Sequence, residues 1–238
     1  MKVSQLRPLY LNGLHADIIT RLDETSICVK LDDQAERRYP LRLLDRVVVI
    51  GLINMPMDVI LACSIKGVSV NFLDGNGKPI AYAHGLILKD FSLLLLLNQF
   101  IDLVDWQDKY ISWKKSTLIQ YEAFFCHSSK NINEIHSSSI NFFNGLLFNQ
   151  INLQLNQVGL MQEMSVFRGS GLAIDVDMVN ILLPFTQQLL LKNLSLVKHD
   201  NYSTKVIATY FEKNFISIND EINRLLKRLN HFLLSHLY

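Results

Sequence analysis

The chain has 238 residues, of which 49% are hydrophobic, and a formal net charge of +1. This length and apolar content are sufficient for a globular protein with a sizeable core. Ten basic residues stand against nine acidic ones up to Gly85, and thirteen stand against thirteen after it. Neither half is therefore a basic domain, and any nucleic-acid binding must come from local groups of cations.

The sequence has no feature that indicates export or a membrane. The longest apolar run, Leu93–Leu97, is far shorter than the ~20 residues that cross a bilayer. The first residues, MKVSQLRPLY, contain no apolar signal core. Cys28, Cys63 and Cys126 form no CxxC pair, which favours free thiols over disulfides or a zinc site. We expect a cytoplasmic protein with no membrane contact.

Up to Gly85, short β-rich runs alternate with turn signals. The expected strands are LYLNG, SICVKL, RVVVIG, VSVNFLD and IAYAHG. The DGNG sequence of Asp74–Gly77 tolerates the positive φ of a tight hairpin. Apolar residues at helical spacing, among them Met57, Leu61 and Ile65, predict one short helix that packs on the sheet.

After Gly85 the apolar residues recur with helical periods. The clearest case is the last segment, where a stripe runs from Ile222 to Leu237 at i, i+3, i+4 and i+7. The sequence therefore predicts an α+β fold. A β-rich domain over residues 1–85 is followed by an all-helical domain over residues 86–238.

The stretch Leu41–Gly85 has a distinctive succession of elements. LRLLDRVVVIG is followed by a helix that starts near LINMPMDVI and then by KGVSVNFLDGNGKPIAYAHG. This order resembles the N-terminal domain of the Cas1 family of CRISPR adaptation integrases. Further on, NFFNGLLFNQINLQLNQVGL is similar to that family's N-x-L-L helix, and TKVIATYFEKNF and the last helix resemble its closing helices. The resemblance implies a homodimer formed through the β-rich domain, with DNA and other CRISPR adaptation or effector proteins as partners.

Members of the Cas1 family hold Mg²⁺ or Mn²⁺ beside a DNA phosphodiester with a Glu, a His and an Asp. The matching positions here are incomplete. Glu134 lacks the family's E-G-x-A-x-x-Y context, and Arg168 stands where GLMQEMSVFR should supply the His. Only Asp177, in DMVNILLP, matches the acidic ligand. The resemblance thus implies no complete metal site and no bound cofactor.

Asp177 also has an ordinary structural interpretation. A carboxylate before an apolar segment commonly starts a helix, and an arginine near it commonly forms an ion pair. On this interpretation Asp177 precedes or caps a helix over Met178–Leu191 and pairs with Arg168. Glu134 and His136 flank one residue and point apart on any regular element, so they form no obvious ligand pair.

Local cations are the candidate nucleic-acid-binding residues. They are Lys114, Lys115, Arg168, Arg224, Lys227 and Arg228. The two neighbouring lysines interleave with Trp106, Tyr110 and Trp113, a pattern that can hold a nucleic-acid backbone. The same three aromatic residues recur at i, i+4 and i+7, which favours packing in a core or an interface.

We expect a Cas1-like CRISPR adaptation protein that has lost its metal site and acts as a DNA-binding or scaffolding subunit. Two alternatives stay open. The first is an active endonuclease or integrase that inserts spacers into a CRISPR array, with Mg²⁺ or Mn²⁺ held by Asp177 and by Glu163, Glu134 or a histidine. The second is a helical protein-interaction module with no nucleic-acid role.

Overall fold

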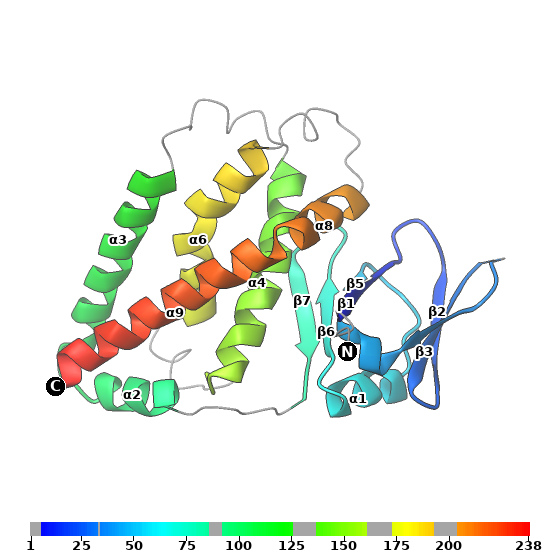
Figure 1. The fold of residues 1–238 in the computed structure, drawn as a ribbon, viewed down its shortest axis with the longest axis horizontal. Helices are drawn as coiled ribbons and strands as arrows, with labels where there is room; N and C mark the ends of the chain where they lie inside the picture. The colour runs from blue at the N-terminus through cyan, green and yellow to red at the C-terminus, as the bar shows by residue number, and fades with distance from the viewer. Residues whose placement is uncertain (1–5, 33, 86–91, 126–136, 161–172, 193–203) are drawn as a thin grey trace, which may run out of the picture. The chain divides into compact units, whose positions relative to one another are not determined.

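The computed structural model describes residues 6–32, 34–85, 92–125, 137–160, 173–192 and 204–238 (Figure 1). The chain forms two compact units, Met1–Ile87 and Leu88–Tyr238. Strands occur in the first unit and long helices in the second, so the predicted α+β class is confirmed. None of the described helices combines the length and the apolarity needed to cross a membrane.

The described residues of the first unit form two sheets and one α-helix. The four-stranded sheet has the order β1 (Arg7–Asn12), β5 (Leu44–Ile50), β6 (Ser69–Leu73) and β7 (Pro79–Ala83), and the three-stranded sheet has the order β2 (Ile18–Asp23), β3 (Ser26–Leu31) and β4 (Arg37–Pro40). Strands β1, β5 and β6 are parallel, and β7 returns antiparallel. Strand β5 is a nearly continuous apolar run because both of its faces are covered.

The predicted hairpin joins β6 to β7. One carboxylate oxygen of Asp74 accepts the backbone N–H groups of Asn76 and Lys78, at 2.9 and 2.8 Å. Gly77 adopts a φ of 82°, which a residue with a side chain rarely takes. The DGNG sequence thus closes the turn with a carboxylate that satisfies local donors and a glycine that permits the backbone.

The short helix α1 (Met57–Ile65) forms where it was expected, but the predicted packing face was wrong. The buried residues are Val59 and Cys63, whereas Met57, Leu61 and Ile65 are exposed. The segment is apolar around most of its circumference, so spacing alone could not choose between two faces. The smaller side chains allow α1 to pack closely against β2 and β6.

The described helices of the second unit are α2 (Ser92–Ile101), α3 (Trp106–Phe125), α4 (Ser137–Gln157), α6 (Ile174–Leu191), α8 (Thr204–Lys213) and α9 (Phe215–Leu237). Helix α6 packs between α3 and α4, and α9 crosses the unit against α2 and α4 (Figure 1). The apolar stripe of α9 is buried from Ile222 to Leu233, as predicted.

Candidate functional site

Asp177 is the fourth residue of α6. The helix begins at Ile174, and the backbone N–H of Asp177 donates to the carbonyl of Ala173 at 2.8 Å. The expectation that Asp177 precedes or caps a helix starting at Met178 was therefore wrong, because the helix starts one turn earlier. A carboxylate in the first turn is still stabilised by the positive end of the helix dipole.

Two side chains of α3 contact the carboxylate oxygens of Asp177. Lys114 Nζ lies 3.0 Å from Oδ1, and the hydroxyl of Tyr110 donates to Oδ2 at 3.2 Å. Tyr110 and Lys114 share one face of α3 because they are four residues apart. Asp177 is 8% exposed and Tyr110 is 1% exposed. Burial, and then the adjacent charge of Asp177, raises the pKa of the Tyr110 hydroxyl well above its ordinary value.

A second buried carboxylate has the same kind of environment. Glu221 on α9 is 5% exposed, accepts the hydroxyl of Tyr121 at 2.6 Å, and pairs with Arg224 at 2.5 Å. Burial, and then the hydrogen bond to Glu221, raises the pKa of Tyr121. Tyr110 and Tyr121 are eleven residues apart on α3, which is about three helical turns. One face of α3 therefore holds α6 and α9 through two tyrosine–carboxylate–cation clusters.

The described residues do not form a site for Mg²⁺ or Mn²⁺. Nowhere in the described ranges do three His, Cys, Asp or Glu side chains converge as metal ligands would. The donors around Asp177 are a hydroxyl and an ammonium, whereas these cations need several oxygen ligands. Glu134, His136, Glu163 and Arg168 lie outside the described residues.

Tyr110 and Trp113 of α3 pack within the helical unit, as their spacing predicted. Trp113 stacks on Phe232 of α9 with ring centroids 5.5 Å apart, and the rings of Trp113 and Tyr110 are also 5.5 Å apart. The stacked contact with Phe232 covers one face of Trp113, and Tyr110 is buried, so neither ring is free to stack on bases with that surface.

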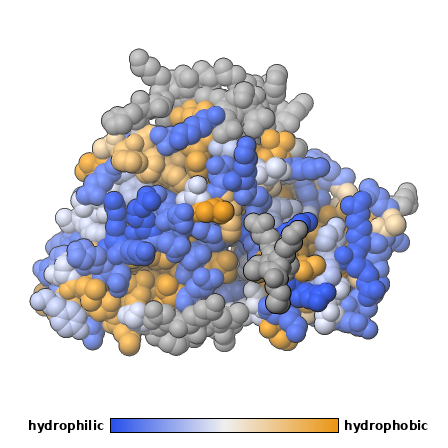
Figure 2. All heavy atoms as spheres, in the orientation of Figure 1, coloured by the Kyte–Doolittle hydropathy of each residue, from blue (hydrophilic) through white to orange (hydrophobic). Residues whose placement is uncertain are grey.

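Cations gather on the outward face of α9, which is hydrophilic in Figure 2. Arg224 and Lys227 line a hollow of about 580 Å³ that also has the polar groups of Asn223 and Asn230. Arg228 lies 5.5 Å from the centre of the Tyr121 ring and donates to Gln120 at 3.1 Å. These side chains are exposed, as is Lys115 on α3, whereas Lys114 is turned to Asp177.

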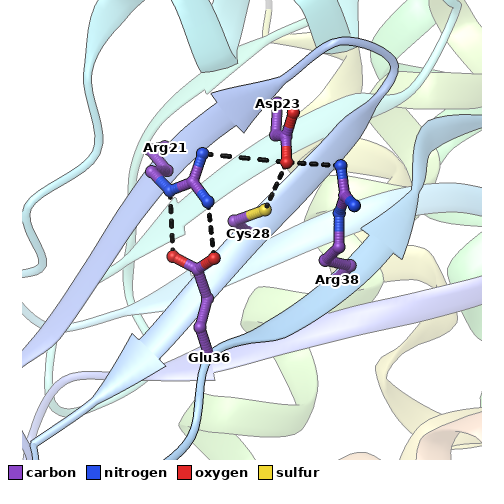
Figure 3. A network of polar contacts seen from close by, with 5 residues as sticks. All are labelled: Arg21, Asp23, Cys28, Glu36 and Arg38. Carbon is purple, nitrogen blue, oxygen red and sulfur yellow. Dashed lines mark hydrogen bonds and ion pairs between the residues drawn. The ribbon is translucent and has the colours of Figure 1, made fainter.

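The three-stranded sheet carries an ionic network that the sequence did not indicate (Figure 3). Arg21 makes a bidentate pair with Glu36, at 2.9 and 2.6 Å, and Arg38 pairs with Asp23. Asp23 also accepts the thiol of fully buried Cys28 at 3.8 Å. Burial raises the pKa of this thiol, which opposes thiolate formation and favours a structural role for Cys28.

Known proteins share this architecture. Residues 14–111 match the family model described as CRISPR associated protein Cas1. A CAS1 protein from Thermotoga maritima, TM1797, superimposes with a TM-score of 0.67 at 13% identity, over 94% of this chain and 97% of its own. No curated protein matches the sequence.

Two further structures show relatives in assemblies. TtCas1 in its DNA complex has a TM-score of 0.52 at 11% identity, over 96% of this chain and 91% of its own. The Cas6-RT-Cas1–Cas2 complex has a chain with a TM-score of 0.64 at 10% identity, over 95% of this chain and 36% of its own. A β-rich unit followed by a helical unit is thus the fold that this chain shares with the Cas1 structures. In sequence, residues 14–111 match the Cas1 family, and in structure the chain shares the fold of Cas1 proteins, in agreement with the resemblance.

Proposed function

We propose that this chain is a DNA-binding component of CRISPR adaptation that does not itself cleave or join DNA. The observation that carries the proposal is the environment of Asp177, which matches the family's acidic ligand. Both of its carboxylate oxygens are engaged by Lys114 and Tyr110. A cation that polarises a phosphate needs several hard ligands at once, and this carboxylate is already neutralised.

DNA binding is supported by the match of residues 14–111 to the Cas1 family and by the cations on the surface of the helical unit. The proposed contacts are Lys115, Arg224, Lys227 and Arg228, with Arg168 as a further contact outside the described residues. Lys227 and Arg228 extend from α9 in the same hydrophilic surface, where they can meet successive phosphates. Because the chain is close to neutral, we expect binding to be weak and steeply dependent on salt.

The β-rich domain, residues 1–85, is proposed to form a two-fold homodimer in the cytoplasm. Its exposed Met57, Leu61 and Ile65 on α1 support this assignment because they lie one turn apart on one face. An antiparallel pair of such helices would bring Leu61 to the two-fold axis and Met57 against the partner's Ile65. Other CRISPR adaptation or effector proteins are the proposed further partners, since a similar chain occurs in an assembly with Cas2.

Fluorescence anisotropy with a branched and a duplex DNA tests the DNA-binding role. We expect measurable binding at low salt, a loss of affinity as salt rises, and at least tenfold weaker binding for the variant Lys227→Glu/Arg228→Glu. Lys30→Glu is the control, because Lys30 is an exposed lysine of β3 in the β-rich unit. Absence of binding at low salt would overturn the proposal. A loss of DNA affinity confined to Lys30→Glu would show that the DNA contacts lie on the β-rich unit instead.

A further inference from the structure

The carboxylate of Asp177 lies in an environment that requires a counter-charge. It is almost fully buried, and an unpaired carboxylate there would bear a large desolvation penalty. Lys114 reaches it from the neighbouring helix, with about a third of its side chain exposed. The stem of the lysine thus lies along the protein while the ammonium meets the carboxylate at the edge of the core.

The cluster at Glu221 shows that this arrangement is a structural device of the helical unit. Glu221, like Asp177, takes one tyrosine hydroxyl and one basic side chain on its two oxygens. The hydrogen bond from Tyr121 to Glu221 joins α3 to α9. The same combination at Asp177 joins α3 to α6, two helices in extensive contact.

We propose that the ammonium of Lys114 takes the place of a divalent cation at Asp177 and converts a former ligand position into a link between α3 and α6. The inference rests on the proposed function for the match of Asp177 to the family motif. It goes further by giving Lys114 a structural role and removing it from the predicted DNA contacts. A divalent cation would have to displace the ammonium, because the two positive charges repel each other at hydrogen-bonding distance.

The experiment measures melting temperatures of the full-length protein and its variants. Lys114→Met should lower the melting temperature by about 5 °C, because it leaves a buried carboxylate without its counter-ion. Lys115→Met is the matched control. It removes the same charge from the next residue, which is exposed, and should change the melting temperature by no more than about 1 °C.

The decisive variant is the double substitution Lys114→Met/Asp177→Asn. Removing both charges should recover at least half of the decrease in melting temperature caused by Lys114→Met. The amide of Asn accepts the Tyr110 hydrogen bond without needing a cation. If Lys114→Met does not fold, recovery of folding in the double variant carries the same information. A melting temperature of Lys114→Met equal to that of Lys115→Met, or a further loss in the double variant, would overturn the proposal.

A Mn²⁺ titration followed by electron paramagnetic resonance separates this inference from the proposed function. The wild-type protein and Asp177→Asn should leave the same amount of Mn²⁺ free. Binding of Mn²⁺ by the wild type that Asp177→Asn abolishes would overturn the inference that the ammonium occupies this position. The affinity of the wild-type protein for DNA is measured separately. Absence of DNA binding would contradict the proposed function without bearing on the role of Lys114.

Discussion

The hydroxyl of Tyr121 donates a 2.6 Å hydrogen bond to the buried carboxylate of Glu221, one hundred residues further along the chain. This bond connects α3 to the C-terminal helix, and Arg224 supplies the cation from the exposed side. The arrangement resembles that of Tyr110, Asp177 and Lys114. Two polar clusters therefore link α3 to α6 and to α9.

Tyr121→Phe should lower the free energy of unfolding by about 1–2 kcal/mol, because Glu221 keeps its burial and loses a donor. Urea unfolding followed by circular dichroism measures the change. Tyr238→Phe is the control, since Tyr238 is 91% exposed and its hydroxyl is in solvent. Equal stabilities for the two variants would contradict a structural role for the cluster.

Stability should fall as the pH rises above about 10, where tyrosine ionises in the unfolded chain. Tyr110 and Tyr121 have raised pKa values in the folded protein, so the folded state holds its protons where the unfolded state releases them. Their contribution is present below the unfolded pKa and is lost as the pH rises toward the folded values. Urea unfolding at a series of alkaline pH values should show that the free energy of unfolding falls as the pH rises. In Tyr110→Phe/Tyr121→Phe it should fall less steeply. An unchanged slope in the double variant would show that other groups control alkaline unfolding.

Cys28 and Cys63 should resist thiol reagents in the native protein. Both are fully buried, and burial raises the pKa of Cys63 to about 11. A Cys126→Ser variant limits the measurement to these two thiols. Reaction with 5,5′-dithiobis(2-nitrobenzoate) at about pH 8 should be slow in buffer and rapid in denaturant, because little thiolate forms in the core. Rapid stoichiometric labelling of the native variant would contradict this.

The wild-type protein should have the mass of a dimer in light scattering at micromolar concentration. Leu61→Glu should shift it to the monomer, because a carboxylate would then lie at the centre of the proposed apolar contact. Val104→Glu is the control, since Val104 is fully exposed in the helical unit. A strictly monomeric wild type would remove the dimer proposal, and a dimeric Leu61→Glu would exclude α1 as its centre.

Local features of the fold could be predicted because their signals are local. The hairpin at Asp74–Gly77 and the buried stripe of α9 follow from residues close together in the sequence. Strand β2 (Ile18–Asp23) was missed because its sequence, IITRLD, has no long apolar run. Its place depends instead on pairing along its length with β3.

The contacts of Asp177 could not be predicted from the sequence. Arg168 was expected to pair with Asp177 because it lies nine positions away, and it falls outside the described residues. The observed ion pair joins Asp177 to Lys114, 63 positions earlier. Tyr110 and Lys114 do have the i, i+4 spacing that places them on one helix face. No sequence signal indicated that α6 would lie against that face, because the partner helix is chosen by the packing of the whole unit.

A strand-transfer and cleavage assay tests the central claim most directly. Branched and duplex DNA would be incubated with the wild-type protein and Asp177→Ala in the presence of Mg²⁺ or Mn²⁺. Because the carboxylate of Asp177 is paired with Lys114 and belongs to no group of three potential metal ligands among the described residues, we predict no joined or cleaved product with either protein. A metal-dependent product that forms with the wild type and disappears with Asp177→Ala would contradict this account and establish an active integrase.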